Sequence, residues 1–486
     1  MNRSLRFLPR LQDIFFAAIF AAVLLLGRRM INLDGDLSRH LTFGGLILSE
    51  DRIPPTEPLI YPYEGRPYVS HEWLSQAAYR LVYNIAGLPG LVLLAAVLLS
   101  SAFFMLYRYL ASRHSLRLPT LFIVTWGAAA TSLNWAIRPH LFSMALLALW
   151  LIWADRLRRD ENISIWRFPL LMALWSNFHG IFIAGILVLF ALAAGWTLDH
   201  LLNKEGSLST GKKIWMALAL STAASMLNPG GAGSWFYIAG FVNNQYLMSR
   251  MVEANPPNFQ LPELRVIFLL IIFSIFLLGV KQNKFSSGQA LLLAGFTAMS
   301  LMSFRNVQLY GVVAPFVLVE AFAGFKNFPL LNRFEHAISN IEGITAKTIY
   351  PPLVVVVVGI FILLSPRAHS FYQFAPEAFP IQAVQWLKSN PQNGRMFNDL
   401  NWGGYLELNL YPQKTFIDSA SDVTGEATRD YETILSTNNN WRELLDHYQI
   451  TWAIIPASAP LANQLKKESG WVTVYEDPVA VIFQRK

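Results

Sequence analysis

The sequence predicts a mainly α-helical protein that crosses a membrane many times and carries a small α/β domain at its C-terminal end. Hydrophobic residues make up 54% of the 486 residues and charged residues only 14%, whereas a soluble domain carries about 25% charged residues. Apolar runs of about 18–20 residues, the length that crosses a bilayer as a helix, recur along the chain. Beyond residue 365 these runs stop, and short segments with the patterns of strands and helices replace them.

The apolar runs predict about eleven membrane-spanning helices in a first domain, residues 1–365. The run at 167–176 is short for a span, so a broken or tilted helix is expected there. The first run follows three arginines and resembles a signal peptide, but the carboxylates close behind it favour an uncleaved anchor. The runs are 14–27, 88–107, 119–135, 141–154, 167–176, 181–200, 214–228, 264–280, 287–303, 307–325 and 350–365.

The distribution of Lys and Arg predicts the orientation of these spans. Both residues concentrate in every second connection, and the cytoplasmic loops of membrane proteins carry such an excess. The N-terminus is therefore expected in the cytoplasm and the C-terminal domain on the extracytoplasmic side of the plasma membrane. The enriched segments are 1–10, 108–118, 155–167, 201–213, 281–286 and 326–349.

Some functions are excluded by what the sequence lacks. The absence of cysteine rules out disulfides, thiolate metal sites and cysteine nucleophiles. The net charge of +7 is explained by the loops, so nucleic acid is not an expected partner. No Walker A, G-x-S-x-G or G-x-G-x-x-G motif occurs, which removes support for nucleotide loops and hydrolase elbows. Carboxylates are nearly absent from the predicted span centres, which argues against a proton-coupled transporter.

The first outer loop, residues 30–87, gathers more ionisable groups than any other membrane boundary. It is expected to contain two helices lying at the interface, 37–49 and 71–86, separated by a segment whose five prolines rule out a helical linker. By helical spacing, Leu37, Leu41 and Leu48 share one face of the first helix, and Trp73, Ala77 and Leu81 share one face of the second.

Asp34-Gly35-Asp36, at the start of this loop, is the main candidate for chemistry. Two carboxylates around a glycine can hold a divalent cation such as Mg²⁺ or Mn²⁺, or one of them can act as a general base. Gly35 permits a turn that brings both side chains to one point. The competing interpretation is that Asp36 caps the helix that follows. A carboxylate beside a span is costly without a partner or a task, which favours a functional role for at least one of the pair.

Two further groups in the loop are candidate substrate-binding residues. His40 lies four residues after Asp36 and shares a helical face with it, either to contact substrate or to form a salt-bridged interface helix. His71 and Glu72 either face substrate or belong to an interface helix anchored by Trp73. They do not form a zinc-protease motif, because position 75 is serine rather than histidine.

Cationic side chains at other predicted outer boundaries are candidates for holding a lipid phosphate through charge-assisted hydrogen bonds. The alternative is that they extend to lipid headgroups as ordinary membrane anchors. Their recurrence on one predicted side of the membrane supports the first interpretation. They are Arg138, His140, His179 and Arg305.

The second domain, residues 366–486, is predicted to be α/β. PIQAVQWLKS and NWRELLDHY are expected to be helices, and RMFND, KTFIDSA, TWAIIP, WVTVYED and VAVIFQR to be strands. Gly403 and Gly404 are expected to permit a close approach to a neighbouring surface, and Asp399 and Asp418 to end strands.

Taken together, these segments resemble the GT-C class of membrane glycosyltransferases, and more closely a poorly characterised prokaryotic group of multispanning proteins near that class. The resemblance implies a GT-C-like fold, a polyprenyl-phosphate-sugar donor used on the outer face, and an aspartate of the first loop as base or metal ligand, here Asp34 or Asp36. It is carried by LDGDLSRHLTFGGLIL, RIPPTEPLIYPYEGRPYVSHEWLSQ, IRPHLFS, LWSNFHG, LNPGG, FRNVQLY, FNDLNWGGYL and FIDSASD, which run almost end to end.

These features predict an inverting glycosyltransferase of the cell envelope. A lipid, glycan or protein acceptor attacks the sugar of the donor, one aspartate takes the proton, and the cationic groups stabilise the departing phosphate. The main alternative is a non-catalytic assembly or lipid-binding protein whose C-terminal domain recruits a partner, and a transporter is the third. Membrane lipids are expected partners under each of these hypotheses.

Overall fold

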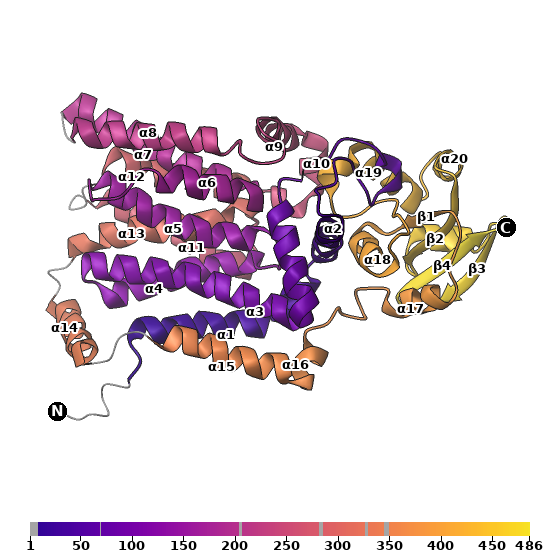
Figure 1. Ribbon diagram of the computed structural model, residues 1–486, viewed down its shortest axis with the longest axis horizontal. Coiled ribbons are helices and arrows are strands. Elements are labelled where there is room, and N and C mark those ends of the chain that lie inside the picture. Colours follow the sequence, from indigo (N-terminus) through magenta and orange to yellow (C-terminus); the bar gives the residue numbers. More distant parts are fainter. Residues whose placement is uncertain (1–7, 69, 204–206, 281–284, 326–328, 345–348) are drawn as a thin grey trace.

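The computed structural model of the protein describes residues 8–68, 70–203, 207–280, 285–325, 329–344 and 349–486. It shows a bundle of roughly aligned helices with a small α/β domain at one end, drawn in orange to yellow at the right of Figure 1. The predicted fold class, a helical membrane protein with a small C-terminal sheet, is confirmed.

Each of the apolar runs lies in a helix of the bundle, and the buried side chains of these helices form one continuous apolar core. The helix α13 is buried on almost all sides, as expected for a helix that is apolar all round. The bundle helices are α1 (Leu11–Asn32), α3 (Trp73–His114), α4 (Arg117–Thr131), α5 (His140–Arg158), α6 (Arg167–Phe178), α7 (Phe182–Asn203), α8 (Leu208–Ala224), α11 (Arg265–Gly279), α12 (Ser287–Met302), α13 (Val307–Phe322) and α15 (Tyr350–Leu364).

Among the helices that the structure describes, five are long and apolar enough to cross a membrane: α1, α3, α5, α7 and the segment Pro262–Gly279 that contains α11. The others in the bundle have 12 to 17 residues, which is shorter than the ~20 that a straight span needs. The sequence predicts about eleven membrane spans, whereas five of the described helices reach the length and apolar character of a span.

The first outer loop folds into α2 (Asp36–Glu50), the 3-10 turn η2 (Tyr61–Tyr63) and the first part of α3. Gly87, with a φ of 60°, interrupts α3, so the segment before it is a separate helical piece, as predicted. Of the residues predicted to share a face, Leu37 and Leu41 are buried, whereas Leu48 and Leu81 are 42% and 53% exposed. The buried stripe of α2 lies nearer its N-terminus, where α3 packs on one side and the C-terminal domain on the other.

The C-terminal domain contains a sheet with the strand order β1-β2-β4-β3. Its strands are β1 (Arg395–Asn398), β2 (Ile450–Pro456), β3 (Trp471–Glu476) and β4 (Ala480–Arg485). Strand β1 runs parallel to β2, and β4 is antiparallel to both of its neighbours, β2 and β3. The helices are α17 (Ile381–Ser389), α18 (Gly403–Leu410), α19 (Ser421–Leu435), α20 (Trp441–His447) and α21 (Pro460–Leu465), and η8 (Leu400–Trp402) precedes α18.

One predicted strand of this domain, KTFIDSA, is wrong. Thr415 instead pairs with the outer loop: its amide donates to the Leu59 carbonyl at 3.0 Å, and its carbonyl accepts from the Tyr61 amide at 3.0 Å. The next amide, that of Phe416, donates to the side chain of Asn398 at 2.8 Å. The segment therefore joins the C-terminal domain to the outer loop instead of extending the sheet.

The remaining elements are short or lie at the ends of the bundle. They are η3 (Ser132–Asn134), α9 (Gly233–Asn243), α10 (Gln245–Arg250), η4 (Val252–Ala254), η5 (Pro262–Leu264), η6 (Phe304–Asn306), η7 (Ala323–Phe325), α14 (Pro329–Ile344) and α16 (Pro366–Phe371). Three of them, α9, α10 and η4, follow α8 at the end of the bundle that faces the C-terminal domain (Figure 1).

Candidate active site

Asp34 lies in the short connection between α1 and α2, and Asp36 is the first residue of α2, directly beneath the C-terminal domain. Gly35 precedes the first turn of α2 with an ordinary φ of −82°, so no special backbone conformation requires glycine here. The requirement is one of space, since a Cβ at Gly35 would lie 2.6 Å from the carbonyl oxygen of Asn401 in η8. The predicted close approach of Gly404 is also confirmed, because a Cβ there would lie 2.6 Å from the Gly35 carbonyl oxygen.

Arg138, just before α5, joins the two carboxylates. One terminal nitrogen of its guanidinium contacts Asp34 Oδ2, and its Nε lies 2.9 Å from Asp36 Oδ2. The three side chains are only 20–23% exposed. The backbone of Arg138 is fixed from α3, because the hydroxyl of Tyr79 donates to its carbonyl oxygen at 2.6 Å. An arginine predicted only from its position at a span boundary thus lies in the same site as the aspartates.

The two aspartates differ in their remaining contacts. Asp34 Oδ1 accepts the backbone N–H of Asp36 at 3.0 Å, so Asp34, rather than Asp36, supports the start of α2. Both oxygens of Asp34 are therefore engaged. For Asp36 Oδ1, by contrast, the part of the chain that the structure describes supplies no hydrogen-bond partner, which leaves that oxygen available to a substrate hydroxyl.

Burial, and then the charge of Asp36, raise the pKa of Asp34 to about 6, although Arg138 acts in the opposite direction. A pair of carboxylates so close together favours a proton on one of them. At pH 7 this places Asp34 near its titration range, where a small change in its surroundings alters its charge.

The second predicted arginine, Arg305 in η6, joins this group through Glu253, a residue that the sequence analysis did not single out. Glu253 Oε2 lies 3.1 Å from Arg138 Nη1, and Glu253 Oε1 lies 3.1 Å from Arg305 Nε. Burial acts to raise the pKa of Glu253, but the charges of Arg138 and Arg305 hold it down at about 2. The only sequence signal for Glu253 is an acidic residue in the connection after α10.

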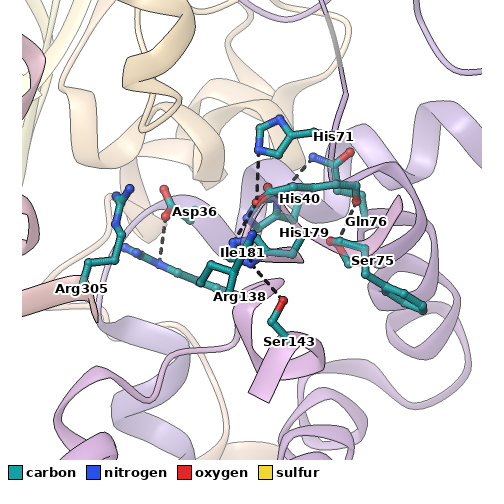
Figure 2. Close-up of polar contacts among 12 residues, drawn as sticks. Asp36, His40, His71, Ser75, Gln76, Arg138, Ser143, His179, Ile181 and Arg305 are labelled. Atoms are coloured by element: carbon teal, nitrogen blue, oxygen red, sulfur yellow. Dashed lines mark hydrogen bonds and ion pairs between the residues drawn. The ribbon is translucent and has the colours of Figure 1, made fainter. Parts of the chain in front are cut away.

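The predicted histidines form a second group around Glu72, at the start of α3. Glu72 Oε1 lies 3.2 Å from His179 Nε2 and 3.6 Å from His71 Nε2, and its Oε2 lies 3.9 Å from His40 Nδ1. Figure 2 shows the three imidazoles close together, beside Arg138 and Asp36. The structure therefore brings the predicted residues of the first loop and the α6–α7 turn to one place.

These imidazoles are linked to neutral polar groups as well as to Glu72. Gln76 Nε2 lies 3.3 Å from His40 Nδ1, and the hydroxyl of Ser143 lies 3.2 Å from His179 Nδ1. Burial lowers the pKa of His40 to about 4 and lowers that of His179 as well. Both rings are therefore neutral at pH 7 and suited to hydrogen bonding rather than to pairing with a phosphate by charge.

His140, also predicted as a site residue, lies at the first position of α5, two residues after Arg138. It is 7% exposed, and its Nε2 has no hydrogen-bond partner within the described residues.

A divalent cation does not fit between Asp34 and Asp36 as they are arranged here, because the guanidinium of Arg138 contacts both carboxylates. The described residues contain no group of three or more His, Asp or Glu side chains that could hold a metal ion.

The C-terminal domain is joined to α2 by a buried ionic cluster centred on Arg39. The Arg39 guanidinium contacts Asp418, lies 2.8 Å from Glu57 and 3.8 Å from Glu407, and all four side chains are at most 4% exposed. Asp418 is thus a partner of Arg39 rather than the end of a strand. Asp399 follows β1 as predicted and accepts the Tyr431 hydroxyl at 2.9 Å within its own domain.

Neither a family model nor a curated protein sequence matches the chain, but solved structures do. The archaeal oligosaccharyltransferase AglB from Archaeoglobus fulgidus, in complex with an inhibitory peptide and a dolichol-phosphate, matches with a TM-score of 0.56 at 10% identity, over 91% of this chain and 69% of that chain. ArnT from Cupriavidus metallidurans in the apo state matches with a TM-score of 0.55 at 11% identity, over 97% of both chains. The chain has a GT-C-like fold.

A second structure of ArnT, bound to undecaprenyl phosphate, matches with a TM-score of 0.51 at 12% identity, again over 97% of both chains. The GT-C-like fold therefore extends over both the bundle and the C-terminal domain. At these identities the likeness establishes the fold, while the chemistry must be argued from the side chains of this chain.

Proposed function

We propose that this protein is an inverting glycosyltransferase that moves a sugar from a polyprenyl-phosphate-sugar donor to an acceptor at the outer face of the membrane. The observation that carries the proposal is the junction of Asp34, Asp36 and Arg138, with Arg305 beyond Glu253, at one end of a GT-C-like bundle. Such a site combines a proton acceptor with fixed positive charge. Those are the two requirements for displacing a phosphate from a sugar by a hydroxyl.

Asp36 is the proposed general base. Its Oδ2 is held by Arg138, and its Oδ1 can accept the proton of the attacking acceptor hydroxyl. Asp34 holds the start of α2 and orients Arg138. Attack from the side of Asp36, opposite the departing phosphate, inverts the configuration at the anomeric carbon in a single displacement.

Arg138 and Arg305 are the proposed phosphate-holding groups. A guanidinium keeps its charge at every relevant pH and can present two parallel N–H donors to phosphate oxygens. The lipid tail of the donor lies along the apolar helices. Glu72 and the neutral imidazoles around it provide hydrogen bonds to sugar hydroxyls, which suits groups that are buried and uncharged.

The C-terminal domain, whose proposed boundary is residue 366, acts as the cover of the site. The domain packs closely against α2 at Gly35 and Gly404, and the Arg39 cluster adds ionic contacts. Together these contacts fix η8 and α18 over the aspartates. We place this domain outside the membrane and the N-terminus in the cytoplasm. The acceptor, whether lipid, glycan or protein, approaches between the domain and the first loop.

The proposal is tested with the purified protein in lipid nanodiscs and a panel of radiolabelled polyprenyl-phosphate sugars, with membrane lipids and glycans as acceptors. The expected result is release of polyprenyl phosphate in equal amount to the sugar transferred, with inverted anomeric configuration by NMR. A product that retains the donor configuration contradicts the single-displacement mechanism.

The alternative, a lipid-binding or assembly protein without catalysis, is favoured by one observation. Both arginines are already paired with carboxylates, and the C-terminal domain packs closely over them. This alternative predicts that the wild-type protein binds undecaprenyl phosphate but transfers no sugar from any donor of the panel.

A further inference from the structure

Glu253 lies between the two arginines that the proposed function assigns to the phosphate. Each of its carboxylate oxygens serves a different guanidinium: Oε2 lies 3.1 Å from Arg138 Nη1, and Oε1 is shared by the Nε and Nη2 of Arg305. A phosphate presents its anionic oxygens to a pair of guanidiniums in the same manner. The carboxylate therefore has the position and the charge of a bound anion.

We propose that Glu253 is an internal counter-anion, which neutralises Arg138 and Arg305 in the absence of substrate and is displaced by the phosphate of a lipid. This inference rests on the proposed function, and it assigns a role to a residue that would otherwise be only a structural partner of the arginines. A neutral ligand in place of the carboxylate would remove the ionic partner of Arg305 and one of the three carboxylate partners of Arg138, so the site favours an anionic lipid.

The geometry allows this exchange to occur by movement of one side chain. The backbone around Glu253 is fixed to η6, because the Ser303 hydroxyl donates to the Glu253 carbonyl at 3.0 Å and the Phe304 amide donates to the Asn255 carbonyl at 2.8 Å. The side chain of Glu253 is 30% exposed and that of Arg305 34% exposed. A rotation about the side-chain bonds therefore moves the carboxylate toward solvent without a rearrangement of the connection.

Removal of the carboxylate charge should consequently strengthen the binding of a lipid phosphate. In the wild-type protein the phosphate must break two charged contacts before it makes its own, whereas Glu253→Gln presents a neutral amide. We expect Glu253→Gln to bind undecaprenyl phosphate at least tenfold more tightly than wild type, since a hydrogen bond to a charged group is worth about that factor or more. Affinity for undecaprenol, which lacks the phosphate, should not change.

The matched control is Glu432→Gln. Glu432 of α19 pairs at 2.8 Å with Arg250 of α10, and the two side chains are 37% and 51% exposed. This variant removes an ion pair of the same kind and should bind undecaprenyl phosphate like wild type. If Glu253 merely positions the two arginines, Glu253→Gln should bind more weakly than wild type, which is the opposite sign.

The binding measurement uses the full-length protein in nanodiscs, with undecaprenyl phosphate, undecaprenol and phosphatidylglycerol as separate probes. If Glu253→Gln binds only undecaprenyl phosphate more tightly than wild type, the displacing phosphate is that of the donor lipid. If it binds phosphatidylglycerol more tightly to the same extent, the displacing phosphate is that of a membrane headgroup. Both outcomes support displacement. Equal or weaker binding by Glu253→Gln overturns the inference. If Glu253→Gln does not fold, the affinity of Glu253→Asp for undecaprenyl phosphate is measured instead. The shorter side chain should also tighten binding, by a smaller factor, and equal or weaker binding would overturn the inference.

The proposed function and this inference fail in different ways. If the wild-type protein transfers sugar while Glu253→Gln shows no gain in affinity, only the role of Glu253 is wrong. If neither protein binds undecaprenyl phosphate, the proposed donor and the role of Glu253 are both wrong.

Discussion

Asp34 and Asp36 share one arginine, yet their surroundings give them different capacities. In the sequence, Asp36 is closer than Asp34 to Arg39 and His40, which favours Asp36 as the base if either residue orients it. The structure supports Asp36 for another reason: Asp34 uses both oxygens, one on the Asp36 amide and one on Arg138. The guanidinium of Arg39 contacts carboxylates of the outer loop and the C-terminal domain. Arg39 therefore does not orient Asp36.

The raised pKa of Asp34 predicts how donor binding depends on pH. Asp34 is mostly protonated below pH 6 and ionised above it, because its pKa is about 6. Ionisation adds a negative charge next to Arg138, so the affinity for an anionic donor should fall as the pH rises from 5 to 7.5. A polyprenyl-phosphate sugar is the suitable probe, since its phosphodiester does not itself titrate in this range.

Asp34→Asn should bind this donor with nearly constant affinity over the same range, because the titrating group is absent. The dissociation constant is measured at pH 5, 6, 7 and 7.5 for both proteins. An equally steep fall in affinity in Asp34→Asn would show that another group causes the dependence.

Glu253 illustrates what a single sequence does not reveal at the scale of residues. Arg138 and Arg305 are recognisable because arginine at a span boundary is unusual enough to be noticed. An acidic residue in an exposed connection is ordinary, and only the folded chain shows that Glu253 lies between two arginines that are more than 160 positions apart in sequence.

At the scale of elements, α2 is the helix on which the site depends. It begins at Asp36, and three positions later Arg39 joins it to the outer loop and the C-terminal domain. Burial, and then the charge of Asp418, raise the pKa of Glu407 well above its usual range, although Arg39 acts to lower it. Arg39 thus contacts several buried carboxyl groups at once, and its charge acts against the effect of burial on the pKa of Glu407 and Asp418.

Arg39→Met should destabilise the protein by about 3–5 kcal/mol, because it leaves buried carboxylates without their cation. The C-terminal domain should also become sensitive to limited proteolysis. Chemical unfolding followed by tryptophan fluorescence measures the stability, with Arg28→Met as the control. Arg28 pairs with Glu377 on the surface, where both side chains are largely exposed, so its loss should cost less than about 1 kcal/mol.

A loss of stability for Arg39→Met no larger than that for Arg28→Met would mean that the cluster does not fix the domain. Asp418 is a buried partner of Arg39, so Asp418→Ala should also lower the stability of the protein.

Elements defined by hydrophobic pattern were predictable, and those defined by contacts across the chain were not. The helices of the bundle, α17, α20 and all four strands follow from local sequence. KTFIDSA has the composition of a strand, but its backbone pairs with residues 59–61 of the outer loop. The helix α18, at NWGGYLELNL, was missed because its two glycines disfavour a helix locally. They are required there by the close approach to α2 and to residues 417–418.

For the whole molecule, the central prediction is the arrangement across the membrane. Arg113 lies in the last turn of α3, and this helix ends on the side of the bundle opposite the C-terminal domain (Figure 1). Because the chain has no cysteine, single introduced cysteines report which side of a sealed vesicle each position faces. The predicted result is labelling of Arg113→Cys from the cytoplasmic side and of Glu64→Cys from the outer side.

The C-terminal domain needs an exposed reporter. Tyr431, a natural choice from sequence, is 7% exposed and bonded to Asp399, whereas the side chain of Arg442 is 62% exposed. Arg442→Cys should be labelled from the same side as Glu64→Cys. Labelling of positions 113 and 442 from one side would refute the predicted topology.

The most direct test of the account is sugar transfer by Asp36→Asn. Asparagine keeps the shape of aspartate but cannot accept a proton as a base, and general-base catalysis is typically worth 10²–10⁴ in rate. In an assay where wild type is active, Asp36→Asn should lose transfer by about that factor while it folds and binds donor normally. Near-normal transfer by Asp36→Asn, and by the double variant Asp34→Asn, Asp36→Asn, would contradict the assignment of this loop to catalysis.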